Sequence, residues 1–245
     1  MVIRYDLRMA KPREIQDRFF KQAKAEGYAA RSAYKLKEIQ ERRRIINRGD
    51  RVVDLGCAPG SWVQVSSQIV GAKGFVVGID LLPVRIDDLP NARTVEGDIY
   101  KVNAAELLAL DPNGGNRLKL FDVVLSDMAP NTEGGAGGSG DHFRSIELCR
   151  RVLALAPKLL KPGGNLVMKV FEGEAYPDLL RETERMFAKG EVKGFKPESS
   201  REVSREMFVV AKKHRPPEAA QADIAPVDKH AMAPARPQPR AGWGT

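Results

Sequence analysis

The feature that most constrains the fold is an alternation of short apolar segments with amphipathic helical patterns between residues 49 and about 212. The apolar segments are short and rich in β-branched residues, which is typical of buried strands. We predict strands at 51–56, 75–80, 92–98, 120–127 and 165–171, and an edge hairpin near 192–196 and 206–212. Strands that alternate with helices favour a mostly parallel sheet with helices on both faces. The predicted fold class is therefore α/β with a seven-stranded sheet.

The net charge divides the chain into three parts. Residues 1–48 hold 14 basic and 6 acidic residues, an excess of 14 − 6 = +8, which equals the net charge of the whole chain. The sequence therefore predicts a basic helical segment at 1–48 and a balanced domain at 49–212. The Ala/Pro-rich residues 213–245 have little periodicity, and we expect a disordered tail there. The localised charge favours a nucleic-acid partner, and the alternative is a solvated, lysine-rich helical face.

The composition limits the cellular compartment and the kinds of covalent or metal cross-link that we expect. No window approaches 18 uninterrupted apolar residues, and residues 1–13 lack the apolar core of a signal peptide. Cys57 and Cys149 lie far apart and match no metal-ligand or redox spacing. We therefore expect a cytoplasmic protein, without a membrane span, disulfide framework or bound metal, that functions as a monomer.

Acidic residues follow three of the predicted strands, at the edge where open parallel sheets bind ligands. The first strand ends in a turn that contains Gly56 and Gly60, where missing side chains would let a ligand approach the backbone. Asp80 follows the second strand and can accept hydrogen bonds from ribose hydroxyls. Asp98 can accept one from an adenine amino group, and Asp127 follows the fourth strand. This pattern predicts a nucleoside-containing cofactor.

Two common nucleotide motifs do not explain the pattern. The only G-x-G-x-x-G match is at Gly135, Gly137 and Gly140, eight residues after its strand and without a following acid at ribose distance. We interpret that segment as a loop and not as a dinucleotide site. The Walker A pattern G-x-x-x-x-G-K-[ST] is not found in the sequence.

The D-x-G-x-x-x-G turn and the strand-end acids resemble Rossmann-like methyltransferases that use S-adenosylmethionine. A wider set of motifs resembles one family among them, the FtsJ ribosomal RNA ribose 2′-O-methyltransferases, over about residues 12–212. The motifs that carry this resemblance are RSAYKL at 31–36, DLGCAPGSW at 54–62, IDLLP at 79–83, SDMAPN at 126–131, MKVF at 168–171 and SRE at 204–206. The chain departs from the family pattern at Cys57 and in the glycine-rich segment 131–140.

The resemblance implies a catalytic tetrad and a set of cofactor contacts. The tetrad residues would be Lys35, Asp127, Lys169 and Glu206. The cofactor contacts would be Gly60, Trp62, Asp80, Asp98 and Asp127. Without the resemblance, Trp62 could equally be a core aromatic, Lys35 a solvated helical lysine and Glu206 a surface charge.

The chemistry of methyl transfer explains these residue types. A ribose 2′-hydroxyl is a poor nucleophile unless a positioned base takes its proton, and a lysine can do so when its surroundings favour the uncharged amine. Lys169 is the candidate base because a lysine within the apolar run VMKVF is costly without a functional partner. Lys35 is the neighbouring cation, and Asp127 can orient the Lys169 amine.

The resemblance implies that the substrate is a uridine of the large-subunit (23S) ribosomal RNA, methylated on the assembled 50S subunit. A transfer RNA or an RNA cap is the alternative substrate. A non-catalytic RNA-binding assembly factor is disfavoured because all four tetrad residues are present. A small-molecule methyltransferase would not need the concentrated N-terminal charge.

Overall fold

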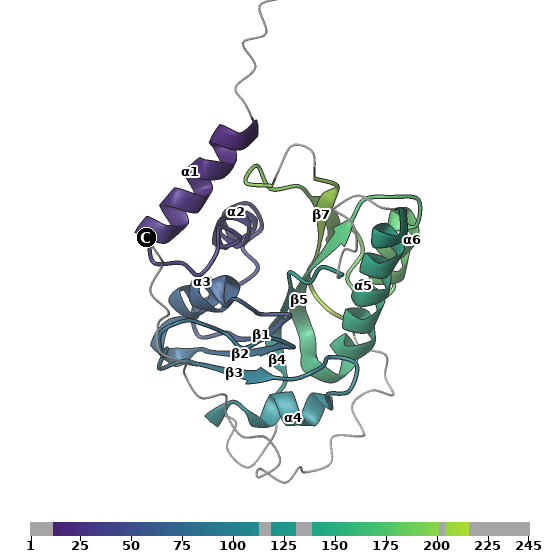
Figure 1. Ribbon diagram of the computed structural model, residues 1–245. Helices are drawn as coiled ribbons and strands as arrows, with labels where there is room; N and C mark the ends of the chain where they lie inside the picture. Colours follow the sequence, from purple (N-terminus) through teal and green to yellow (C-terminus); the bar gives the residue numbers. More distant parts are fainter. Residues whose placement is uncertain (1–11, 113–118, 131–138, 201–203, 216–245) are drawn as a thin grey trace, which may run out of the picture.

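A computed structural model describes residues 12–112, 119–130, 139–200 and 204–215 (Figure 1). The chain forms one seven-stranded sheet in the order β3-β2-β1-β4-β5-β7-β6. The strands are β1 (Arg51–Leu55), β2 (Phe75–Asp80), β3 (Ala92–Glu96), β4 (Phe121–Ser126), β5 (Leu160–Phe171), β6 (Val192–Phe195) and β7 (Glu206–Ala211). The helices are α1 (Pro12–Ala25), α2 (Ala33–Arg43), α3 (Ser61–Val70), the 3₁₀ turn η1 (Gly71–Lys73), α4 (Ala104–Ala109), α5 (Ser139–Leu159) and α6 (Tyr176–Glu184).

The sheet confirms the predicted α/β fold. β1 to β5 are mutually parallel, whereas β7 runs antiparallel to both β5 and β6. β5 is longer than predicted and begins at Leu160, which pairs with Phe121 before the register shifts toward Val123. The Pro162-Gly163-Gly164 segment, which precedes the predicted strand at 165–171, lies within this longer strand.

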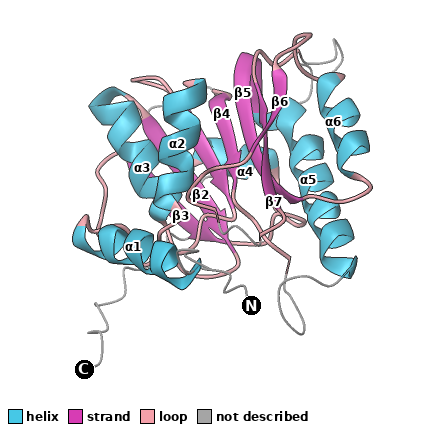
Figure 2. Ribbon diagram, turned by 90° about the horizontal axis from the view of Figure 1, so that it is seen from above, coloured by secondary structure: helices cyan, strands magenta, loops and turns pink. Residues whose placement is uncertain are grey.

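Helices cover both faces of the sheet (Figure 2). One buried cluster packs α4, α5 and α6 against one face, with Leu107, Val152 and Leu179 fully covered. A second cluster packs α2 and α3 against the other face, through Leu36, Ile39 and Val63 among others. The apolar side of α2 therefore belongs to the core of the sheet domain, although α2 lies within the basic segment 1–48.

Local signals explain where several helices begin and end. Asn103 caps α4: its side chain accepts a hydrogen bond from Ala105 N–H at 3.1 Å, and the Glu106 carboxylate accepts one from Asn103 N–H at 3.3 Å. This reciprocal pair is a capping box. After α1, Gly27 adopts a φ of 76°, a left-handed conformation that suits glycine at a helix end.

Within the residues that the structure describes, no helix is long and apolar enough to cross a membrane. The Ala/Pro-rich tail beyond residue 215 and most of the glycine-rich segment 131–140 lie outside the described residues.

Candidate active site

The register of the sheet brings two predicted site residues onto one face. Lys169 of β5 pairs with Phe208 of β7, and Phe171 pairs with Glu206. Side chains that are directly opposite or two residues apart lie on the same face of a sheet. Phe208 is part of the core beneath α2 and α3. Lys169 and Glu206 therefore face the α2 side of the sheet.

Helix α2 supplies the third residue. The ammonium nitrogen of Lys35 lies 2.7 Å from both Oε1 and Oε2 of Glu206. Lys35 Nζ also lies 5.9 Å from the centre of the Phe208 ring. The two charged side chains are only 10% and 9% exposed. Neither is a solvated surface charge, which was the alternative interpretation for both residues.

The loop after β4 supplies the fourth residue. Lys169 Nζ donates a hydrogen bond to the backbone oxygen of Asp127 at 2.5 Å and lies 2.8 Å from the carboxylate Oδ1. The Lys169 side chain is 8% exposed and that of Asp127 is 17% exposed. Asp127 occupies this position because Ser126, the last residue of β4, pairs with Met168. The two lysines thus each have a carboxylate partner, which reduces the cost of burying charge.

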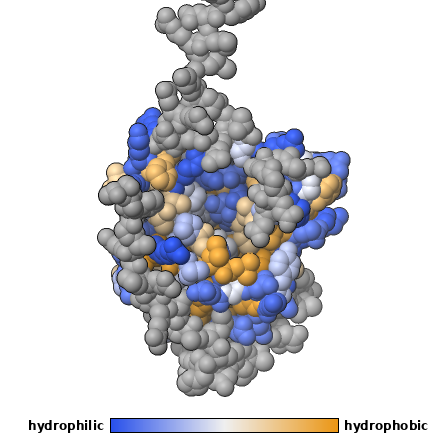
Figure 3. All heavy atoms as spheres, in the orientation of Figure 1, coloured by the Kyte–Doolittle hydropathy of each residue, from blue (hydrophilic) through white to orange (hydrophobic). Residues whose placement is uncertain are grey.

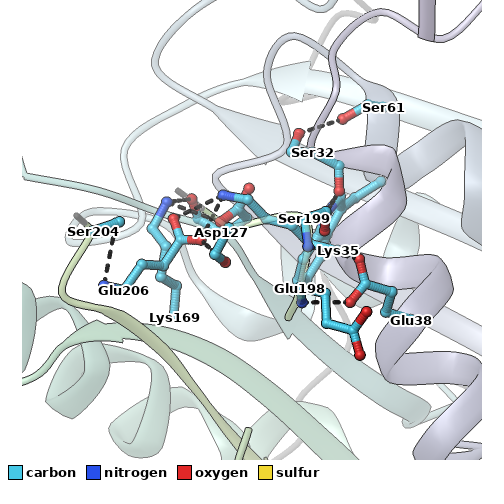
Figure 4. A network of polar contacts seen from close by, with 12 residues as sticks. Ser32, Lys35, Glu38, Ser61, Asp127, Lys169, Glu198, Ser199, Ser204 and Glu206 are labelled. Carbon is cyan, nitrogen blue, oxygen red and sulfur yellow. Dashed lines mark hydrogen bonds and ion pairs between the residues drawn. The ribbon is translucent and has the colours of Figure 1, made fainter. Parts of the chain in front are cut away.

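Figure 4 shows Asp127, Lys169, Lys35 and Glu206 gathered in one network of polar contacts. On the face seen in Figure 3, hydrophilic residues gather in a central hollow, and hydrophobic residues border it below. The structure brings together all four residues of the predicted tetrad, although they come from four separate parts of the chain.

The predicted cofactor acids lie at the carboxyl ends of the neighbouring strands: Asp80 is the last residue of β2, and Asp98 follows β3. Asp80 accepts hydrogen bonds from Ala58 N–H and Leu82 N–H, each at 2.9 Å, so it joins the β1–α3 turn to the end of β2. Asp98 accepts one from Tyr100 N–H at 2.9 Å. A carboxylate has about four lone-pair sites, so both acids keep acceptor capacity for a ligand.

The backbone conformation of the β1–α3 turn explains why it contains glycines. Gly56 and Gly60 have φ values of 81° and 116°, which side chains rarely adopt. A Cβ atom at Gly60 would come within 2.7 Å of Val84 and Ile86 side-chain atoms. The space beside Gly60 is thus occupied by the protein itself, whereas the sequence suggested room for a ligand.

Trp62 lies in the core. Its ring stacks on Phe208 at 5.7 Å between centroids, its Nε1–H donates to the backbone oxygen of Ser32 at 2.8 Å, and it is 2% exposed. The side chain therefore fills the space between α3 and the sheet. Trp62 is the second residue of α3, where backbone N–H groups have no partner within the helix, so its contribution to a ligand would be that N–H group.

Sequence reasoning did not assign a role to Asp54, which is fully buried in β1. Neither carboxylate oxygen has a hydrogen-bond partner among the described residues. Burial raises the pKa of Asp54 well above its usual value, and the negative charges of Asp127 and Asp80 raise it further. The signal was available in the sequence, because Asp54 interrupts an apolar strand in the same way as Lys169 does.

A nucleoside-containing cofactor with positive charge fits these residues. Asp80 and Asp127 both lie close enough to Asp54 for their negative charges to raise its pKa, and Asp98 follows the adjacent strand. A sulfonium and an amino group would reduce the repulsion among these carboxylates, and the buried, unpartnered oxygens of Asp54 lie near the end of β1. The sheet order, the antiparallel β7 and this acidic edge define the class of methyltransferases that use S-adenosylmethionine.

Comparison with known proteins identifies the family. The model of the FtsJ-like methyltransferase family matches residues 28–214, so the chain belongs to that family. Similar curated proteins are named ribosomal RNA large subunit methyltransferase E. The one from Desulfatibacillum aliphaticivorans is 44% identical over 80% of this chain and 89% of its own length. The one from Methanothrix thermoacetophila is 45% identical over 82% of this chain and 74% of its own.

Solved structures agree with this placement. A ribosomal RNA methyltransferase from Plasmodium falciparum, described as putative, is 28% identical and has a TM-score of 0.63 over 76% of this chain and 98% of its own. Fibrillarin from Aeropyrum pernix, solved with bound S-adenosyl-L-methionine, shares the fold with a TM-score of 0.51 at 18% identity, over 74% of this chain and 73% of its own. The protein is a methyltransferase of this family.

Proposed function

We propose that this enzyme methylates the ribose 2′-hydroxyl of a uridine in large-subunit (23S) ribosomal RNA, on the assembled 50S subunit. The observation that carries the proposal is the pairing of Lys35 with Glu206 and of Lys169 with Asp127 in one buried network. The names of the curated relatives support the choice of ribosomal RNA. The motifs described above, from RSAYKL to SRE, support the 2′-hydroxyl as acceptor.

The strand-end residues would hold the cofactor. When bound, S-adenosylmethionine supplies an electrophilic methyl group on a sulfonium. Asp80 would accept hydrogen bonds from its ribose hydroxyls, and Asp98 from its adenine amino group. The backbone at Gly60 and the Trp62 N–H group would contribute from the start of α3. Asp127 lies between this edge and Lys169, so it would contact both the cofactor and the base.

Lys169 would act as the general base. In its uncharged form, Nζ carries a lone pair that can take the 2′-hydroxyl proton. The ammonium that results would be stabilised by the Asp127 backbone oxygen and carboxylate, which lie 2.5 and 2.8 Å away. Lys35, held by Glu206, would be the neighbouring cation on the same face of the sheet. Orientation of the hydroxyl by the same groups would contribute as well.

The basic segment 1–48 would contact the RNA backbone. Arg42 and Arg44 are exposed at the end of α2, the helix that also carries Lys35. Phosphate contacts from this helix end would place the substrate ribose near the tetrad. A monomer in the cytoplasm, where ribosomal subunits are assembled, is part of the same proposal.

Transfer of a labelled methyl group to unmodified 50S subunits tests the proposal. The wild-type enzyme should form a ribose 2′-O-methyl uridine, and Lys169→Ala should form none while it still binds S-adenosylmethionine. Equal product from both enzymes would exclude Lys169 as the required base. Methylation of transfer RNA instead of 50S subunits would overturn the substrate assignment. Cofactor binding without transfer to either RNA would support the assembly-factor alternative.

A further inference from the structure

The Glu206 carboxylate has a second buried partner besides Lys35. The hydroxyl of Ser200 donates a hydrogen bond to Glu206 Oε1 at 2.8 Å. Ser200 and Glu206 are both at most 9% exposed. The bond joins the β6–β7 loop to the first residue of β7. Lys35 Nζ contacts both oxygens of the same carboxylate. The hydrogen bond from Ser200 to one of these oxygens therefore limits rotation of the carboxylate relative to Lys35.

Helix α2 holds this loop in place. The carboxylate of Glu38 accepts hydrogen bonds from Glu198 N–H at 2.7 Å and from Ser199 N–H at 3.0 Å. Ser200 follows directly, and its own N–H donates to Pro197 O at 3.1 Å, which closes a tight turn. In Figure 4, Glu38 and Lys35 extend from the same helix, Glu38 toward Glu198 and Ser199.

We propose that Ser200 and Glu38 are positioning residues for methyl transfer. They close a cycle of contacts that runs from Lys35 to Glu206, on to Ser200, through the loop to Glu38, and back along α2. Lys35 and Glu38 are three residues apart, so they lie on neighbouring positions of one helical face. The cycle sets the Lys35 ammonium and the Glu206 carboxylate relative to each other and to Lys169. This role rests on the proposed function of the tetrad.

The cycle predicts a defined kinetic effect. Loss of the Ser200 hydroxyl removes one of the two partners that orient the Glu206 carboxylate, and small displacements in an active site cost up to roughly 100-fold in rate. We expect kcat to fall roughly 10- to 100-fold in Ser200→Ala, with little change in the affinity for S-adenosylmethionine, because the cofactor acids lie at other strand ends. Glu38→Ala should give the same pattern, since it releases the loop.

The chain offers matched controls for both residues. Ser199 is buried beside Ser200, and its hydroxyl has no hydrogen-bond partner among the described residues. Glu41 is exposed on the same helix as Glu38. Ser199→Ala and Glu41→Ala should retain wild-type kcat. Ser200→Thr and Ser200→Val have nearly the same shape, and only threonine keeps the hydroxyl, so only threonine should retain activity.

A double-mutant cycle tests the contact without any RNA. We would measure the decrease in melting temperature, relative to wild type, for Ser200→Ala, Glu206→Gln and the double variant. The decrease in the double variant should differ from the sum of the two single decreases, because both substitutions disrupt the same hydrogen-bonded network. Additive decreases in melting temperature, or equal kcat for Ser200→Thr and Ser200→Val, would overturn the proposal. A wild-type enzyme that methylates no 50S subunits, combined with non-additive melting, would instead reject the proposed substrate and retain the Ser200–Glu206 coupling.

Discussion

Lys35 and Glu206 form a buried ion pair at 2.7 Å although 171 residues separate them in the chain. The pair connects α2, one helix of the basic segment 1–48, with the antiparallel strand β7. Through the pairing of β7 with β5, it also lies beside Lys169. A single contact therefore couples the expected RNA-binding segment, the sheet and the candidate base.

Breaking this pair from one side should destabilise the fold. Lys35→Met leaves the Glu206 carboxylate buried without its cation, and loss of one partner of a buried pair costs about 3–5 kcal/mol. Urea unfolding should show a lower free energy of unfolding by an amount of that order. Lys37→Met is the control, because its pair with Glu26 is 38% and 37% exposed and should contribute less than about 1 kcal/mol. Equal losses for the two variants would contradict the burial argument.

Asp54→Asn should make the protein more stable at neutral pH. The pKa of Asp54 is raised, so the folded state holds the proton more tightly than the unfolded state does. Its favourable contribution is therefore complete below the unfolded pKa, near 4, and is lost as the pH rises above it. Asparagine removes this dependence. Thermal unfolding from pH 4 to 8 should show an advantage for Asp54→Asn that grows with pH, and a constant difference would count against the assignment.

Substitutions at Trp62 and Asp80 should distinguish a role in core packing from a role in cofactor binding. Trp62→Phe removes a core hydrogen bond to Ser32, which costs about 1 kcal/mol of stability, but it leaves the backbone N–H of α3 in place. Calorimetric affinity for S-adenosylmethionine should therefore change little. Asp80→Asn removes the negative charge of the group that would accept hydrogen bonds from the ribose hydroxyls. The substitution should weaken the binding of S-adenosylmethionine about tenfold or more. The reverse ranking would mean that the Trp62 side chain contacts the cofactor.

The arginines that end α2 should contribute to RNA affinity. Replacing Arg42 and Arg44 by alanine should weaken 50S binding and lower the slope of log K against log salt by about one for each lost phosphate contact. Arg150→Ala and Arg181→Ala serve as controls, because these residues lie on α5 and α6, on the other face of the sheet. An unchanged salt slope in the α2 variant would place the RNA contact elsewhere.

The spacing of apolar residues, together with the turn residues between the apolar segments, was enough to predict most of the fold. The five parallel strands and the edge hairpin were confirmed near the predicted bounds because each buried strand is a short, β-branched run. The boundary between α5 and β5 was not predicted well. The predicted strand begins at residue 165, after a proline and two glycines, whereas pairing of Leu160 with Phe121 extends the strand through Pro162, Gly163 and Gly164. Tertiary pairing overrode the local signal.

The tetrad was predicted through motifs, and the structure brings all four residues together. The roles of the other residues depended on what surrounds them. Trp62 next to a glycine turn was consistent with a ligand contact, but its ring lies against Phe208 in the core. Ser200 and Glu38 have no distinctive sequence pattern, because their partners, Glu206 and the loop amides, meet them only in the folded chain.

The sequence alone determined the α/β alternation, the acidic strand ends and the concentration of positive charge in residues 1–48, because these depend on residue type and local order. Tertiary structure alone decided which charges are buried and paired. Lys35 is one of several basic residues on a basic segment, and only the packing of α2 against β7 converts it into the partner of Glu206. Desolvation and pairing depend on distances in space, and spacing along the chain does not encode them.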